Sequence, residues 1–343
     1  MAKSRLTKRW FVALAFLGVL IVAAIWFFSG LRAVSPNPKE AKTYVRYENP
    51  TRLSVIIRSL EKQGIVRNAL ATRLLALLER RPTIVTAGTY SIGAGMNAEQ
   101  ILRQLRKPIS LVIRLPETNW ANRTAHLLEN EDTVNADEYM SLVHDPKEFA
   151  SDVSFPLPKD SLEGYLYPKK YDLAPLVGAR TVILKQLKEF EKNVWNGPER
   201  PKDMQRTLTL ASLVQLESGK DADRAMIAGV IENRLKKKMP LQIDAALLYG
   251  IQKWRRLSFK DYRTIDSPYN TYRVKGLPPG PICSPDEKDI EAALHPAKHN
   301  YLYYVALPDG RSIYAENYKD HLKNIEIRKA AIKERNAAKK IVP

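Results

Sequence analysis

The strongest constraint on the fold is an uncharged apolar run near the amino terminus, from Trp10 to Leu31. A helix needs about 20 apolar residues to cross the hydrocarbon core of a bilayer, and this run has that length. Four cations precede it: Lys3, Arg5, Lys8 and Arg9. Because positive charge beside a span marks the cytoplasmic side, we expect residues 1–9 in the cytoplasm, residues 10–31 in the membrane and the rest of the chain exported.

A cleaved signal peptide is the alternative interpretation of this segment. The apolar run is longer than an ordinary signal-peptide core, and no clean small-x-small cleavage motif follows it, so we favour the anchor. Residues 32–47 are polar and contain Pro36 and Pro38. We expect them to form a linker between the membrane and the first folded domain.

The chain is strongly basic, with a net charge of +18. Much of this charge lies in the first nine residues and in a tail from Lys323 to Lys340, which we expect to be a basic helix. Such a helix is usually solvated, although it could favour an anionic surface such as lipid headgroups or an acidic wall polymer. We expect no nucleic-acid partner for an exported chain. The single cysteine, Cys283, excludes an intramolecular disulfide.

The hydrophobic pattern after the linker predicts a small unit of helices and strand between residues 48 and 108. We expect helices at 53–64 and 68–79, a strand at 87–92 and a helix opened by Asn97 and Gln100 at capping-box spacing. The apolar positions of the second helix are Leu70, Leu74, Leu77 and Leu78. No catalytic grouping is present, so this unit is a binding module or a spacer.

Residues 109–343 mix helical and strand patterns, which makes the fold class α+β. We expect a strand at 110–115, helices at 121–130, 180–194 and 225–237, and a loop or variable insert at 145–160. A buried strand at 301–306 is followed by a turn at Asp309 and Gly310 and a second strand at 312–315.

The stretch from Leu208 to Gly219 holds the main candidate residue. Leu210, Leu213 and Val214 lie on one stripe of a helix, and Glu217 is the next residue on it. Desolvation at such a position raises the pKa of a carboxyl and keeps it protonated near neutral pH, as a general acid requires. The alternative is a helix end whose last polar residue emerges into solvent.

Two other stretches suggest a carbohydrate groove. Tyrosines and amides in 269–272 stand near a rigid Pro-Pro-Gly turn in 276–282, and sugars offer hydroxyls to amides and ring faces to aromatic side chains. A stiff surface loop is the alternative. Glu163, in the aromatic stretch 162–171, is a second candidate carboxylate or a solvated turn residue.

Motifs for phosphate, metal and redox chemistry are missing from the sequence. It contains no Gly-rich phosphate loop, no His-Glu-x-x-His, no Cys-x-x-Cys and no Gly-x-Ser-x-Gly. His295 and His299 are four residues apart, but Pro296 between them disfavours a shared helical metal face. We expect no metal and no cofactor.

The ordered set of stretches resembles the YceG-like family of endolytic murein transglycosylases. The matching pieces cover nearly the whole chain after the apolar run, and each is weak alone whereas the set is specific. They are residues 87–90, 162–168, 211–217, 233–235, 241–244, 269–272, 276–282 and 295–303.

The resemblance implies a single-pass inner-membrane protein with a periplasmic LysM-like domain (48–108) and a mixed α+β catalytic domain (109–343). It implies cleavage of the β-1,4 bond between N-acetylmuramic acid and N-acetylglucosamine within nascent glycan strands, leaving 1,6-anhydromuramic ends. Such a cut would terminate glycan elongation, and peptidoglycan synthases are possible partners. Glu217 matches the family's catalytic glutamate.

A lytic transglycosylase can work with one carboxylate, whereas an ordinary glycosidase uses two. We expect Gln242, Asn270 and Tyr272 to contact the glycan or to orient the acid. Asp244 and Glu163 are further groove candidates, and either could serve as a second carboxylate that permits hydrolysis. The structural alternative is that Asp244 caps a helix and Glu163 is solvated.

The chain departs from the family pattern at four places. Gln215 stands where another glutamate is usual, and Thr118 replaces a glycine. Residues 283–286 replace an Asn-Pro-Gly, and residues 311–314 lack the usual histidine and phenylalanine. Two rival functions remain open: a muramidase that uses water, and a non-catalytic, membrane-tethered wall-binding protein.

Overall fold

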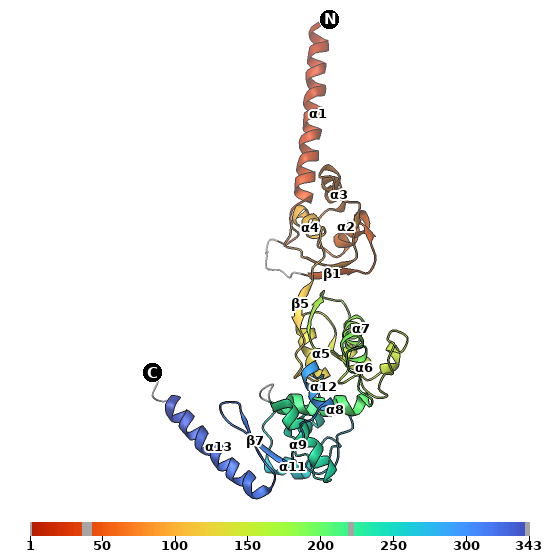
Figure 1. Ribbon diagram of the computed structural model, residues 1–343. Coiled ribbons are helices and arrows are strands. Elements are labelled where there is room, and N and C mark those ends of the chain that lie inside the picture. Colours follow the sequence, from red (N-terminus) through yellow and green to blue (C-terminus); the bar gives the residue numbers. More distant parts are fainter. Residues whose placement is uncertain (1, 36–42, 219–222, 340–343) are drawn as a thin grey trace. The chain divides into compact units, whose positions relative to one another are not determined.

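The computed structural model describes residues 2–35, 43–218 and 223–339 (Figure 1). This part of the chain is mixed α+β, as the sequence predicts. It divides into two compact units, Met1–Leu111 with Asp172–Val177, and Val112–Tyr171 with Gly178–Pro343.

The first unit begins with a long apolar helix, α1 (Ala2–Gly30). Its segment Trp10–Gly30 has a mean hydropathy of 2.8 and is long and apolar enough to cross a membrane. The helix also includes residues 2–9, which we expected only as a cytoplasmic tail.

The expected linker differs from the structure at both of its ends. Strand β1 (Thr43–Tyr47) lies inside it and pairs antiparallel with β4 (Gly88–Ile92). At its start, the Ser35 amide donates to the carbonyl of Ala94 at 3.0 Å. Among the described residues β1 pairs with one strand, so it is an edge strand, and an edge strand tolerates the polar composition that suggested a linker. Pro36 and Pro38 lie outside the described residues.

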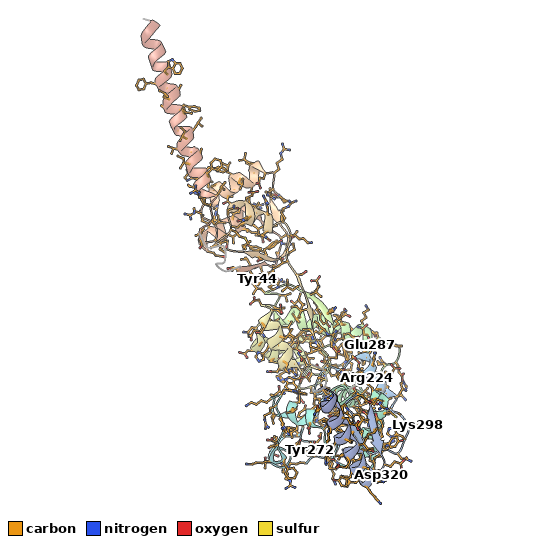
Figure 2. All side chains as sticks on the ribbon, turned by 90° about the vertical axis from the view of Figure 1, so that its left-hand side faces the viewer. Tyr44, Arg224, Tyr272, Glu287, Lys298 and Asp320 are labelled. Atoms are coloured by element: carbon orange, nitrogen blue, oxygen red, sulfur yellow. The ribbon has the colours of Figure 1, made fainter. Side chains whose placement is uncertain are left out.

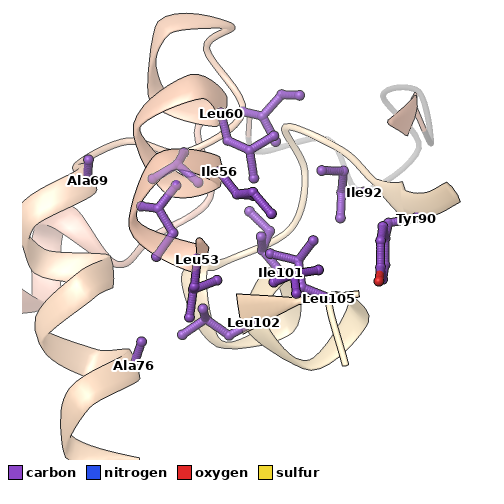
Figure 3. Packing of buried hydrophobic residues seen from close by; sticks show 14 residues of the cluster. Leu53, Ile56, Leu60, Ala69, Ala76, Tyr90, Ile92, Ile101, Leu102 and Leu105 are labelled. Carbon is purple, nitrogen blue, oxygen red and sulfur yellow. The ribbon is translucent and has the colours of Figure 1, made fainter. Parts of the chain in front are cut away.

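The other elements of the first unit close around one apolar core (Figure 3). Helix α4 begins with the expected capping box, in which Asn97 and Gln100 bond reciprocally. The core is built from Ile56, Ile57, Leu60, Tyr90, Ile92 and Ile101, among others. The remaining elements are β2 (Thr51–Arg52), α2 (Leu53–Lys62), α3 (Ala69–Leu78), β3 (Ile84–Val85) and α4 (Ala98–Gln104).

The second unit is mostly helical. Its first half holds β5 (Leu111–Arg114), α5 (Ala121–Asn130), α6 (Ala136–Val143), the short helix η1 (Pro146–Phe149), β6 (Lys170–Leu173), α7 (Ala179–Phe190) and η2 (Glu191–Trp195). Its second half holds α8 (Met204–Glu217), α9 (Arg224–Lys236), α10 (Asp244–Gly250), α11 (Phe259–Thr264), α12 (Glu287–Leu294), β7 (Tyr303–Ala306), β8 (Ser312–Ala315) and α13 (Tyr318–Lys339). The unit boundary falls within both β5 and β6, which pair with each other.

Helix α8 is the centre of the second unit. All of its residues from Thr207 to Gln215 are buried, and it packs against α9, α10 and α12. The hairpin β7–β8, with Tyr303 opposite Ala315, packs against α13. Because α8 is enclosed on most sides, its carboxyl end carries Glu217 to the edge of the core.

Candidate active site

Glu217 is the last residue of α8. The helix starts where Asp203 accepts a hydrogen bond from the Arg206 amide at 3.0 Å. Leu210, Leu213 and Val214 are fully buried along the predicted stripe. Glu217 continues this stripe to the wall of a cavity of about 450 Å³.

The surroundings of the Glu217 carboxyl bring its pKa close to neutral pH. Burial raises its pKa to about 7, and the charge of Asp244 acts in the same direction. The Tyr304 hydroxyl donates to Glu217 Oε2 at 2.7 Å, and this bond and Arg234 lower the pKa. Glu217 is half-buried, and its carboxyl is bonded to Tyr304 on the cavity wall, so the helix end does not emerge into open solvent as the alternative supposed.

The cavity brings three of the other candidate residues to Glu217. These are Gln242, Asp244 and Tyr272 (Tyr272 is labelled in Figure 2). The remaining wall consists of Val230, Ile231, Arg234, Leu241, Ile243, Tyr304, His321 and Arg328. The site therefore combines one desolvated acid, one further carboxyl group, two tyrosines and two arginines.

Asp244 is held by two tyrosines. Its Oδ1 accepts a short hydrogen bond from the Tyr272 hydroxyl, and its Oδ2 accepts from the Tyr262 hydroxyl at 3.4 Å. The two rings pack 4.3 Å apart. Asp244 is the first residue of α10, but Ile243 holds the capping position, so the helix-cap alternative for Asp244 is wrong.

Arg234 and Gln242 lie next to each other in the wall. The Arg234 guanidinium donates to the carbonyls of Leu302 at 2.7 Å and Leu241 at 2.8 Å, and to Gln242 Oε1 at 3.4 Å. Gln242 has a φ of +54°, which is uncommon outside glycine. Its amide donates to the Thr271 carbonyl at 3.0 Å. Two hydrogen bonds hold this strained backbone conformation, one from the Gln242 amide to Thr271 and one from Arg234 to the Gln242 side chain.

Comparison with known proteins shows the family of the chain. A model of the YceG-like family matches residues 45–327. The chain belongs to the YceG-like family. A protein of Bacillus subtilis named endolytic murein transglycosylase is 32% identical over 87% of this chain and 88% of its own length. One of the same name from Streptococcus pneumoniae is 31% identical over 86% of this chain, which spans 60% of that longer relative.

The fold has a counterpart among solved structures. A crystal structure of a YceG-like protein from Listeria monocytogenes covers 82% of this chain and 99% of its own, at 29% identity and a TM-score of 0.55. The family and the shared fold agree with the resemblance drawn from the ordered stretches.

Asn270 does not line the cavity of this YceG-like chain, which corrects the expected groove contact. Asn270 is fully buried. Its Nδ2 donates to the Ile265 carbonyl at 2.8 Å and its Oδ1 accepts from the Tyr272 amide at 3.2 Å. The amide group is thus used within its own loop, where it places Tyr272.

Glu163 lies in a different cavity, of about 520 Å³, which Tyr249 and Tyr269 also line. It is buried, so the solvated-turn alternative is wrong. Its Oε2 accepts from the Ala121 amide at the start of α5, at 2.9 Å. Burial raises the pKa of Glu163 to about 8. The structure does not bring it to Glu217 as a second carboxylate.

Sequence reasoning missed Tyr304, Arg234 and His321. Tyr304 lies in a strand that was expected to be buried throughout, and Arg234 in a stretch that only supported the resemblance. His321 lies in α13, just before the predicted basic tail, and the same helix places Arg328 on the cavity wall. One signal in the sequence could have indicated Tyr304. Successive side chains of a strand point to opposite faces, so Tyr304 in 301–306 faces the other way from Tyr303 and Val305.

The two histidines considered for a metal have separate partners. His295 Nε2 lies 2.7 Å from Glu199, and His299 Nε2 lies 3.0 Å from the Met226 carbonyl. Within residues 2–35, 43–218 and 223–339, no group of three or more His, Cys, Asp or Glu side chains is arranged to hold a metal ion.

Proposed function

We propose that this chain is an endolytic murein transglycosylase with Glu217 as its acid and base. The observation that carries the proposal is the position of the Glu217 carboxyl, bonded to Tyr304 at 2.7 Å on the wall of a polar and aromatic cavity. Burial there raises its pKa to about 7. The names of the B. subtilis and S. pneumoniae relatives support the substrate and the reaction.

The reaction needs no water. Protonated Glu217 donates its proton to the glycosidic oxygen as the bond from that oxygen to C1 of N-acetylmuramic acid breaks. The resulting carboxylate then accepts the proton of the sugar's own C6 hydroxyl, whose oxygen forms a bond to C1. The products are a 1,6-anhydromuramic end and a free hydroxyl on N-acetylglucosamine, and Glu217 is protonated again.

The other wall residues support this cycle. The Asp244 carboxylate would stabilise positive charge that develops at C1, and its charge also keeps the proton on Glu217. Tyr272 orients Asp244, and Tyr304 orients Glu217. Gln242, held by Arg234, is placed to bind sugar hydroxyls or N-acetyl groups.

The cellular placement is part of the proposal. We infer that residues 1–9 are cytoplasmic, residues 10–31 span the inner membrane, and the rest of the chain faces the periplasm. The cations before the apolar run support this orientation. We further propose that 48–108 is a LysM-like glycan-binding domain and that 109–343 is the catalytic domain. A cut in nascent strands would place the protein near peptidoglycan synthases.

Mass spectrometry of the products tests the proposal. The full chain in detergent is incubated with uncrosslinked glycan beside Glu217→Gln and the matched control Glu163→Gln. Anhydro ends from the parent and Glu163→Gln, with none from Glu217→Gln, are the expected result. Reducing ends would indicate hydrolysis, with Asp244 as the second carboxylate. Absence of product with glycan binding intact would leave the non-catalytic binder.

A further inference from the structure

The most unusual surface outside the active site is the leucine face of α3. Leu70, Leu74, Leu77 and Leu78 are 63%, 45%, 74% and 68% exposed. The buried face of the helix consists instead of Ala69, Ala71, Thr72 and Ala76. A helix of a water-soluble domain normally buries its largest apolar residues, so this reversed arrangement marks an interaction surface.

Helix α3 stands next to the end of the apolar helix α1, which contacts the small, buried side of α3 and leaves the leucine face uncovered. Gly30 is buried, and a β-carbon added to it would lie 3.0 Å from the β-carbons of Asn68 and Ala71. The carbonyl of Leu31 accepts from the Ala98 amide at 2.9 Å. Arg67 donates to the carbonyl of Ala33 at 2.8 Å. Helix α3 is therefore fixed beside the last turns of α1 (Figure 1).

The length of α1 places the membrane surface at this contact. Its apolar segment Trp10–Gly30 has 21 residues. At 1.5 Å per residue it spans about 31 Å, close to the roughly 30 Å thickness of the hydrocarbon core. If Trp10 lies at one boundary of the core, Gly30 lies at the other, and α3 starts at that depth.

The charges around α3 complement lipid phosphates. Arg67 precedes the helix, Arg73 lies within it and Arg80 follows it. The next residue, Arg81, is already paired with Glu79 at 2.6 Å. Arg73 and Arg81 also line a cavity of about 400 Å³ together with Leu77. Apolar side chains beside arginines are the composition of helices that lie in a membrane interface.

We propose that α3 lies in the leaflet from which α1 emerges, with its leucine face among acyl chains and its arginines against lipid phosphates. The inference rests on the proposed function in one respect, that α1 spans the membrane. It adds that the first unit is not tethered loosely but is docked on the bilayer through α3.

Site-specific fluorescence tests this docking in the full chain. Leu77→Cys is labelled with bimane, and the protein is reconstituted in vesicles of phosphatidylethanolamine and phosphatidylglycerol. Leu77 is exposed, so its replacement removes no core packing, and the native Cys283 is fully buried and serves as an unlabelled background. Quenching by doxyl-labelled lipid is compared with quenching by aqueous iodide.

Two matched positions calibrate the result. Val19→Cys reports on the anchor. Thr43→Cys reports on the exposed first residue of β1, a strand that Figure 1 shows at the end of the first unit away from α1. Tyr44, the next residue of β1, is also labelled far from α1 in Figure 2. We expect lipid quenching at Leu77 to approach that at Val19 and to exceed that at Thr43 several-fold, with the reverse order for iodide.

Three other outcomes would overturn the inference. Lipid quenching at Val19 with iodide quenching at Leu77 would place the anchor in the membrane and α3 in water. Protection of Leu77 from both quenchers would show that a protein, such as a second copy of the chain, covers the leucine face. Failure of lipid to quench Val19 would instead reject the transmembrane anchor on which the inference rests.

Discussion

At the scale of single residues, the state of Glu217 results from opposing effects. Burial and the charge of Asp244 favour its protonated form, whereas the Tyr304 hydroxyl and Arg234 favour the carboxylate. The balance puts its pKa at about 7, so both protonation states are accessible at neutral pH. This is what one group needs if it must first donate a proton and then accept one.

The first prediction concerns the pH dependence of turnover. Because the protonated form starts the cycle, kcat falls as pH rises through about 7, by about tenfold per pH unit well above it. Initial rates on soluble uncrosslinked glycan between pH 5.5 and 9 measure this fall of kcat with pH. A kcat that stays constant to pH 9 would contradict the role of Glu217 as the acid.

The second prediction is that Tyr304→Phe shifts the fall of kcat with rising pH to higher pH. The substitution removes the hydroxyl that stabilises the Glu217 carboxylate, so the pKa of Glu217 rises. Tyr303→Phe is the matched control in the same strand. It also removes a tyrosine hydroxyl, but the contacts of Tyr303 with His321 and Arg234 are made by its ring, which phenylalanine retains. The two pH profiles are compared with that of the parent, and an unshifted profile in Tyr304→Phe would refute the assignment.

The third prediction links Glu217 to stability. In the folded chain the carboxyl holds its proton up to about pH 7, but in the unfolded chain only up to its ordinary pKa of 4.5. Its contribution to stability is therefore complete below pH 4.5 and is lost by the time the pH has risen through about 7. Glu217→Gln should raise Tm relative to the parent at pH 8 more than at pH 4.5.

Thermal unfolding at these two pH values measures the difference. The exposed Glu316, changed to Gln, is the control and should show no comparable gain. An equal Tm difference for Glu217→Gln at both pH values would mean that its pKa is the same in the folded and unfolded chain.

At the scale of elements, local signals were read correctly from the sequence. The capping box of Asn97 and Gln100 opens α4, and the turn at Asp309 and Gly310 joins β7 to β8. Both depend on residues a few positions apart. The stripe that ends in Glu217 likewise needs only the period of one helix.

Features that depend on residues far apart in the sequence could not be predicted from such local signals. Tyr304 bonds Glu217 from 87 residues away. Asn270 and Tyr272 are near neighbours, yet one is enclosed in its loop and the other reaches the cavity. Burial of Glu163 follows from packing around α5, and the exposure of the α3 leucines fits the membrane contact proposed for them.

The fourth prediction concerns the turn that carries Glu163. Gly164 has a φ of +88°, and a β-carbon there would lie 2.5 Å from Pro281 Cγ. Gly164→Ala should therefore destabilise the fold by about 1–3 kcal/mol or more. Gly276→Ala is the matched control, because Gly276 has a φ of +97° but no atom within 4 Å of an added β-carbon.

Denaturant unfolding of both variants separates backbone strain from steric overlap. The larger loss in Gly164→Ala reports the overlap with Pro281. Equal losses in the two variants would show that Pro281 moves aside without cost.

At the scale of the whole molecule, every residue that lines the Glu217 cavity comes from the second unit. The apolar helix and the leucine face of α3 belong to the first unit. The proposed catalysis therefore belongs to one unit and the proposed membrane attachment to the other. Substitutions on the leucine face should leave the chemistry at Glu217 unchanged.

The most direct test of the central claim is whether water enters the product. The full chain is incubated with uncrosslinked glycan in water enriched in oxygen-18, and the new ends are analysed by mass spectrometry. Because the C6 hydroxyl of the sugar replaces water as the nucleophile, we predict anhydro ends that carry no heavy oxygen. A heavy oxygen atom at each new end would contradict the account and show that the enzyme hydrolyses the bond.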